Sequence, residues 1–194
     1  MIQSFLEVFS VINTQIFIVA ILLFFVGYAI APTAHYKKIK WLTAYPFYII
    51  KLMDVFLKKR HHPVKIFFII FFLNSISLFL NLISAWGIFL PVLFILYMGI
   101  NIGVIMYHSL EGKLYYVGLL NPVALLELPA AWLSITMAIQ FSLQNFFKIS
   151  FLPAIGFMQY VNYFLSTIIP LLFMAGVLET ILIIKGEKNK NSTG

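Results

Sequence analysis

Residues 64–85 read VKIFFIIFFLNSISLFLNLISA and contain a single charged side chain, Lys65. A helix of about 20 such residues crosses the hydrocarbon core of a bilayer. Of the whole chain, 62% is hydrophobic and 10% is charged, whereas about a quarter of a soluble domain is charged. The sequence therefore predicts an all-α, polytopic membrane helix bundle with five transmembrane helices. The other four predicted spans are 12–31, 88–108, 123–141 and one that begins near Tyr160.

The apolar stretch 151–184 is longer than one crossing. We expect Pro153 and Gly156 to separate a short interfacial or re-entrant piece from the fifth span, because both residues interrupt helices. The alternative is two full crossings and six spans. We assign residues 1–194 to one transmembrane domain, and we expect the polar residues 186–194 to be a disordered tail.

The basic residues indicate the orientation in the membrane. With five spans, all of the 13 Lys and Arg residues except Lys148 lie on one side. Cytoplasmic segments carry such an excess of positive charge, so the pattern predicts a multi-pass cell-membrane protein with an outside amino terminus and a cytoplasmic carboxyl terminus. Six spans would weaken the bias.

Residues 36–60 alternate basic and aromatic side chains at helical spacing. This pattern is typical of an amphipathic helix that lies in the membrane interface and binds anionic headgroups, with Trp41, Tyr45 and Phe56 near the acyl boundary. We expect Pro46 to break the helix in two; an ordinary charged loop is the alternative. Because the charges flank apolar runs, lipid is favoured over nucleic acid as their partner. The predicted membrane-surface residues are Lys37, Lys38, Lys40, Trp41, Lys58, Lys59 and Arg60.

Glu127 and Glu179 are the acidic residues inside the predicted spans. An intramembrane carboxylate costs roughly 2.5 to 3.5 kcal/mol on insertion scales, so each must be neutral or have a partner. Both lie within a turn or two of the same interface, and we expect them to face the bundle interior near one another. They form one predicted polar site with Asn74, Asn101 and Pro129.

Two interpretations of this polar site stay open. In the first, the site holds a proton, a cation or a partner's basic residue. In the second, it is a structural hydrogen-bond cluster in which Pro129 frees a backbone carbonyl for the Glu127 carboxyl. Gly99 and Gly103, four residues apart in the third span, favour close helix packing.

Several kinds of site are not expected. The chain has no cysteine, and His61 and His62 are neighbours that point apart on a helix, so we predict no metal site. The motifs of serine hydrolases, zinc proteases and phosphate-binding loops do not occur. The sequence predicts no enzyme and no cofactor.

The order of these features resembles the stage II sporulation protein M family between Val64 and Ile184. The most specific match is Glu127-Leu128-Pro129-Ala130, although Val123 stands where the family has histidine. The matching segments, in order, are Asn74-Ser75, Trp86-Gly87, Met98-Gly99 with Gly103, Pro122 to Ala130, and Ala175 to Glu179.

The resemblance implies an integral membrane protein that, in spore-forming bacteria, anchors cell-wall-degrading partners during engulfment. We therefore expect a scaffold that recruits membrane or envelope proteins. The alternative is a small transporter or channel subunit that uses the intramembrane carboxylates as an ion or proton site. Five spans rarely enclose a pore alone, so this alternative requires a homo-oligomer or another partner.

Overall fold

The computed structural model describes the backbone of residues 2–58 and 62–192, and the side chains of residues 5, 7–52 and 62–185. Within these ranges 85% of the residues are helical and no strand occurs, which confirms the all-α class. The elements in chain order are α1 (Ile2–Val11), α2 (Thr14–Tyr36), α3 (Lys40–Lys58), α4 (Pro63–Ile83), the 3-10 turn η1 (Ser84–Trp86), α5 (Leu90–Ser109), the 3-10 helix η2 (Tyr115–Leu120), α6 (Ala124–Phe147), α7 (Phe157–Tyr163), the π-helical turn η3 (Phe164–Ile168) and α8 (Ile169–Ser192).

Five helical segments of the described chain are long and apolar enough to span a membrane, as the sequence predicts. They are α2, α4 with η1, α5, α6, and the continuous segment Phe157–Lys185. The last of these forms one crossing, so the described structure has five spans and not six. Its helix begins at Phe157, directly after Gly156, and residues 148–156 form a connecting loop without a separate helical piece.

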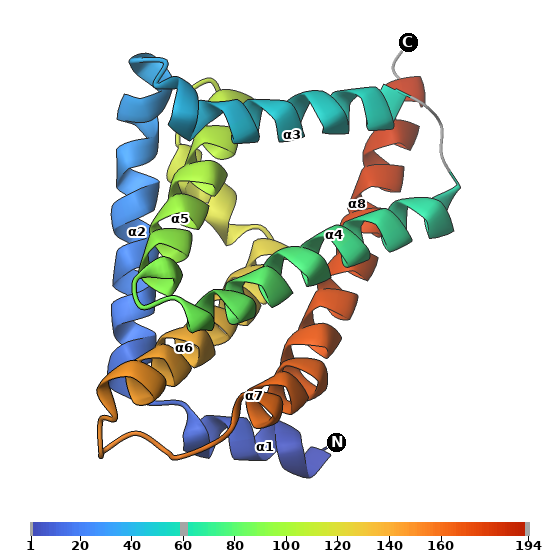
Figure 1. Cartoon of the computed structure of the whole chain (residues 1–194). Coiled ribbons are helices and arrows are strands. Elements are labelled where there is room, and N and C mark those ends of the chain that lie inside the picture. Colours follow the sequence, from blue (N-terminus) through green and yellow to red (C-terminus); the bar gives the residue numbers. More distant parts are fainter. Residues whose placement is uncertain (1, 59–61, 193–194) are drawn as a thin grey trace.

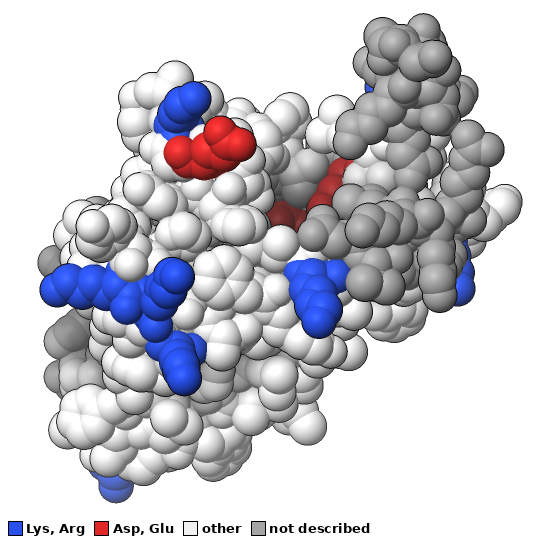
Figure 2. Space-filling model, turned by 90° about the horizontal axis from the view of Figure 1, so that it is seen from above, with Lys and Arg blue, Asp and Glu red and all other residues white. Residues whose placement is uncertain are grey.

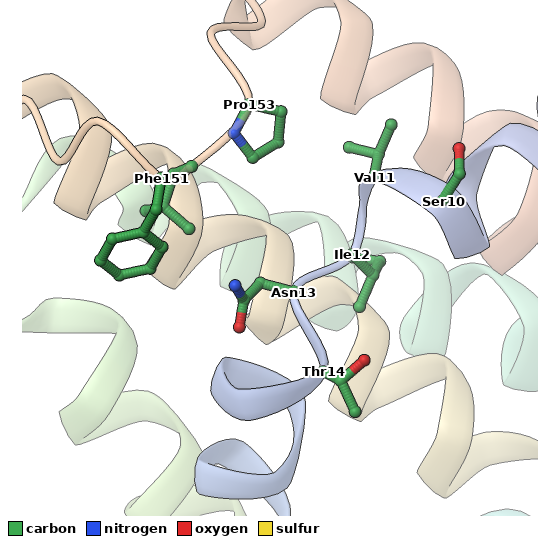
Figure 3. A pocket seen from close by; sticks show the side chains of 8 residues that line it. Ser10, Val11, Ile12, Asn13, Thr14, Phe151 and Pro153 are labelled. Carbon is green, nitrogen blue, oxygen red and sulfur yellow. The ribbon is translucent and has the colours of Figure 1, made fainter.

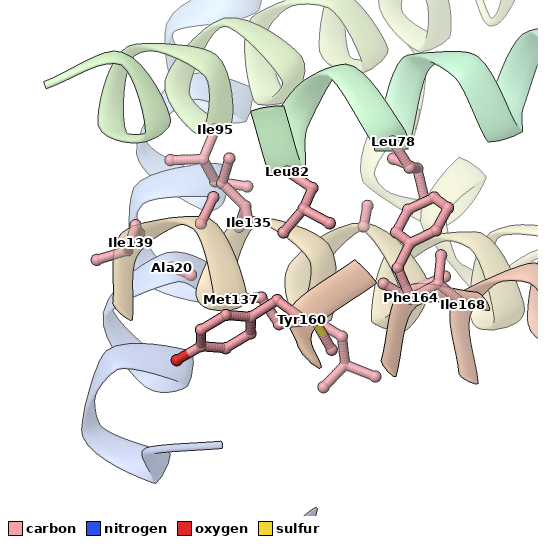
Figure 4. Close-up of a cluster of buried hydrophobic side chains, with 14 of the residues drawn as sticks. Ala20, Leu78, Leu82, Ile95, Ile135, Met137, Ile139, Tyr160, Phe164 and Ile168 are labelled. Carbon is pink, nitrogen blue, oxygen red and sulfur yellow. The ribbon is translucent and has the colours of Figure 1, made fainter. Parts of the chain in front are cut away.

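Helix α6 is the centre of the bundle. In the most apolar window of α6, 72% of the residues are buried, against 28–39% in the other four spans. Its buried positions include many small residues, such as Ala130, Ala131, Ser134 and Ala138, which allow neighbouring helices to approach closely. Figure 4 shows its larger side chains Ile135, Met137 and Ile139 packed among residues of four other segments: Ala20, Leu78, Leu82, Ile95, Tyr160, Phe164 and Ile168.

Helices α2 and α5 lie side by side and run in the same direction (Figure 1). Their backbones touch at three glycines. A Cβ atom on Gly27 would lie 2.1 Å from the Leu96 carbonyl oxygen, and one on Gly99 would lie 2.2 Å from that of Phe24. A Cβ atom on Gly103 would lie 2.5 Å from the Ala31 Cβ atom and 3.0 Å from the Tyr28 carbonyl oxygen. These contacts agree with the predicted packing role of Gly99 and Gly103 and identify α2 as the partner helix.

Two prolines lie inside helices. The first predicted span, 12–31, ends too early, because α2 continues through Pro32 to Tyr36. The predicted break at Pro46 is wrong, because α3 is one helix. The φ angle that proline imposes suits a helix, and one missing N–H group is tolerated where the neighbouring packing is favourable.

Pro170 has a visible effect on its helix. Proline lacks an N–H group, and its ring clashes with the carbonyl four residues earlier, which here belongs to Ser166. The helix widens into the π turn η3 at this point. Such a turn accommodates the proline without ending the span.

The two ends of the bundle carry different elements. Figure 1 shows α3 lying across the end where α2 and α5 finish, and α1 lying across the opposite end, beside α7. Helix α8 continues at the α3 end to Ser192, so the backbone is helical where the sequence predicts a disordered tail from residue 186. This segment contains Lys and Glu, which favour helices, and it contains no proline that would stop one.

Candidate functional site

Three polar residues from three helices come together. Asn74 lies on α4, Glu127 on α6 and Glu179 on α8, and these helices pack against one another in pairs. The Asn74 Nδ2 group donates a hydrogen bond to Glu127 Oε1. Glu179 lies close enough to Glu127 for the charges of the two carboxylates to interact. We call these three residues the carboxylate cluster.

The start of α6 positions Glu127. The Asn121 side chain accepts a hydrogen bond of 2.8 Å from the Ala124 N–H group, and Glu127 follows in the first turn of the helix. A negative charge in the first turn interacts favourably with the helix dipole. Pro129, two residues further on, deprives the Leu125 carbonyl of its helical donor. The hydrogen bond found for the Glu127 side chain within the described part of the chain is nevertheless the one from Asn74.

The carboxylate cluster is half-buried rather than enclosed. Figure 2, a view onto the α3 end of the molecule, shows acidic side chains in a hollow and basic side chains spread over the rest of this face. Because apolar spans surround the cluster, each carboxyl group needs a proton or a hydrogen-bond donor. One amide donor, from Asn74, leaves most acceptor positions of the two groups available for a ligand or partner.

Asn101 does not join the cluster. It is buried on α5, whose main neighbour is α2, and its Oδ1 atom has no hydrogen-bond partner among the described residues. The structure thus divides the predicted polar site into the carboxylate cluster and a separate asparagine. Asn81, another amide of the spans, directs its Nδ2 atom at the Met98 sulfur at 4.0 Å.

Four of the seven predicted membrane-surface residues lie around the corner between α2 and α3. Lys37, Lys38, Lys40 and Trp41 are exposed there, and the side chain of Trp41 is 74% exposed. The Lys58 side chain, Lys59 and Arg60 lie outside the described residues, as does the Phe56 side chain.

Helix α3 is anchored by an aromatic cluster. The Phe47 ring lies 5.6 Å from the His35 ring of α2 and 5.4 Å from the His108 ring of α5, measured between ring centroids. The two imidazole rings are 5.7 Å apart. Packing against these rings holds α3 across the helix ends. In the described residues no three His, Asp or Glu side chains form a group suited to a metal ion.

Gln140 is a polar residue that the sequence pattern does not single out. It is fully buried on α6; its Nε2 group donates to the Val11 carbonyl at 3.1 Å, and its Oε1 atom accepts from the Asn13 N–H group at 3.0 Å. The link between α1 and α2 is thereby attached to the central helix. The sequence signal that could have identified Gln140 is its position as an amide near the end of a largely apolar span.

A pocket of ≈ 490 Å³ opens beside this link, at the end of the molecule opposite α3. Figure 3 shows that residues of the α1–α2 link and of the loop after α6 face one another across it. Its lining contains polar side chains but no ionisable one. It is lined by Ser10, Val11, Ile12, Asn13, Thr14, Phe151, Leu152 and Pro153.

The family model of stage II sporulation protein M matches residues 14–182. This match begins in α2 and includes α3, whereas the resemblance in the sequence begins at Val64. No curated protein and no solved structure matches the chain. Because the family model covers most of the chain, from the start of α2 into the fifth span, this multi-pass membrane protein belongs to the stage II sporulation protein M family.

Proposed function

We propose that this protein is a membrane scaffold that binds other membrane or envelope proteins. The observation that carries the proposal is the half-buried carboxylate cluster at the junction of α4, α6 and α8. A basic or hydrogen-bond-donating side chain of a partner would satisfy acceptors that Asn74 leaves available. Family membership supports this role, because the resemblance implies an anchor for cell-wall-degrading partners.

The second candidate is a small transporter or channel subunit. The position of Glu179 near Glu127, which is hydrogen-bonded to Asn74, favours this function. Two nearby carboxyl groups inside a membrane can also bind a proton or a cation. This function requires a homo-oligomer or another subunit to complete a pathway.

The proposed location is the cell membrane, with the α3 end in the cytoplasm. The basic side chains on that end support this orientation, because positive segments remain cytoplasmic and contact anionic headgroups. The amino-terminal end then lies outside. We further propose that the protein itself is not an enzyme and needs no cofactor, and that its activity lies in the partners that it recruits.

Purification in mild detergent separates the two candidate functions. A scaffold tagged after Gly194 is expected to retain discrete membrane proteins at constant stoichiometry from its native membranes, and a five-span protein of another family serves as the control. The same purified chain, reconstituted alone or as a homo-oligomer in vesicles, is expected to give no proton or cation flux.

The Glu127→Gln and Glu179→Gln variants sharpen this comparison. Glutamine keeps a donor and an acceptor at nearly the same size but carries no charge. A transporter would lose flux in both variants although each one folds. Flux by the wild-type chain that disappears in these variants, without copurifying partners, would show that the scaffold proposal is wrong.

A further inference from the structure

Helix α1 presents three different faces. Val8 is fully buried, Phe5 and Phe9 are 37% and 60% exposed, and Ser10 is exposed. Successive residues of a helix are turned by about 100°, so Phe5 and Phe9 share one face, and Ser10 points away from the face of Val8. The two phenylalanine rings pack edge to face, with centroids 5.5 Å apart.

The packing of α1 fixes the direction of these faces. Helix α1 lies crosswise at the end of the bundle opposite α3 and contacts α7 and η3 (Figure 1). The Gln140 hydrogen bonds attach its carboxyl end to α6. Val8 therefore faces the bundle, and the face of Phe5 and Phe9 is turned to the side of this direction. Lipid surrounds the spans of a membrane protein, so side chains that point sideways at the end of the bundle meet lipid at the level of the interface.

The surroundings of α1 also contain exposed phenylalanines. Phe146 and Phe147 at the end of α6 are 41% and 56% exposed, and Phe151 in the loop after α6 is 67% exposed. The α3 end instead exposes Tyr and Trp beside lysines, which is typical of contact with charged headgroups. The only charged residue of α1 is Glu7. Lys148, directly after Phe147, is a single exposed lysine at this end, against several lysines at the α3 end. The α1 end therefore has the apolar rings for insertion into lipid but few basic groups for electrostatic binding.

We propose that α1 is a second interfacial helix, in the leaflet opposite α3, and that Phe5 and Phe9 insert into the boundary between headgroups and acyl chains. Its partner is the lipid surface itself, without a requirement for anionic headgroups. The bundle is thus held in the bilayer from both sides, by charge and aromatic rings at α3 and by phenylalanine at α1. This inference is independent of the proposed scaffold function.

Tryptophan fluorescence tests the proposal in the full chain. The three native tryptophans are first replaced by phenylalanine (Trp41→Phe, Trp86→Phe and Trp132→Phe), and either Phe9→Trp or Ser10→Trp is then introduced. In vesicles of phosphatidylcholine, Phe9→Trp is expected to emit at short wavelength and to be quenched by lipids brominated along the acyl chain. The matched reporter Ser10→Trp is expected to be quenched several-fold more by aqueous acrylamide.

A second arm tests the lipid class. The fluorescence of a chain that keeps only Trp41 is expected to change when phosphatidylglycerol replaces part of the phosphatidylcholine. The fluorescence of the Phe9→Trp chain is expected to stay the same. Equal exposure of Phe9→Trp and Ser10→Trp to acrylamide, in a chain whose circular dichroism and melting match the wild type, would overturn the proposal. Contact of Phe9→Trp with lipid only in the presence of phosphatidylglycerol would also overturn it, because that binding would be electrostatic.

Discussion

The Gln140 side chain is both a hydrogen-bond donor and an acceptor, and an apolar side chain can replace neither function. Because its amide group both donates to Val11 and accepts from Asn13, Gln140→Leu leaves two backbone groups without partners. We expect this substitution to destabilise the protein by about 1 to 3 kcal/mol. Thermal unfolding in detergent measures the loss, and hydrogen exchange at the Asn13 amide reports the local opening.

Gln159→Leu is the matched control for Gln140. Gln159 is exposed, and its side chain bonds to Tyr163 on the same helix at 2.9 Å, so its loss is expected to be small. Equal unfolding temperatures for the two leucine variants would contradict the role assigned to Gln140.

Glu127 is expected to tolerate glutamine better than alanine. An amide in place of the carboxyl group preserves a hydrogen bond with Asn74, whereas Glu127→Ala leaves the half-buried Asn74 amide without its acceptor. We expect Glu127→Ala to lower the free energy of unfolding by about 1 to 3 kcal/mol and Glu127→Gln to change it little. Detergent unfolding curves of both variants test this order. If glutamine destabilises as much as alanine, the negative charge itself is required for folding.

Single residues were predictable where membrane physics leaves few alternatives. A carboxyl group inside an apolar span must have a partner, so Glu127 and Glu179 stand out in the sequence. The identity of the partner does not follow, because Asn74 is 53 residues away in the chain and reaches Glu127 only through helix packing. Gln140 was missed because an amide near a span end also fits a water-facing position.

At the scale of the helix, the α2–α5 contact depends on the absence of Cβ atoms. Gly99→Ala would place a carbon 2.2 Å from the Phe24 carbonyl oxygen, which is backbone and has little freedom to move. The two helices must separate, at a cost of about 1 to 3 kcal/mol. Gly156→Ala is the control, since nothing lies within 4 Å of its added Cβ. Melting temperatures in one detergent should fall for Gly99→Ala alone; a similar fall in both variants would contradict this close contact.

Helix boundaries show where sequence patterns are less informative. The lengths of the apolar runs correctly predicted the five spans of the described chain, because the thickness of the bilayer fixes the length of a span. Proline was a poor guide: α2 and α3 continue through Pro32 and Pro46, since tertiary packing compensates for one lost hydrogen bond. Gly27, the counterpart of Gly99 and Gly103 on α2, was not predicted, because pairing between spans is invisible in a single sequence.

At the scale of the whole molecule, an odd number of spans separates the two ends of the chain. A reporter that is active only in the cytoplasm, fused after Gly194, is expected to be active, and the same reporter before Met1 is expected to be inactive. The reason is the basic bias, from which Lys148 is the single exception. Activity of the amino-terminal fusion, together with an inactive carboxyl-terminal fusion, would reverse the orientation.

The π turn η3 also determines which side chain the last span directs at its neighbours. A turn that absorbs one extra residue rotates everything after it by about 100° relative to an uninterrupted α-helix. The segment before it is held in place by the buried side chains of Tyr160 and Tyr163. Without the wide turn, Leu178 would take the direction that Glu179 has now, and the carboxylate would turn away from α6. The rotational phase of the acidic residue is thus set at Ser166 and Pro170, far from the residue itself.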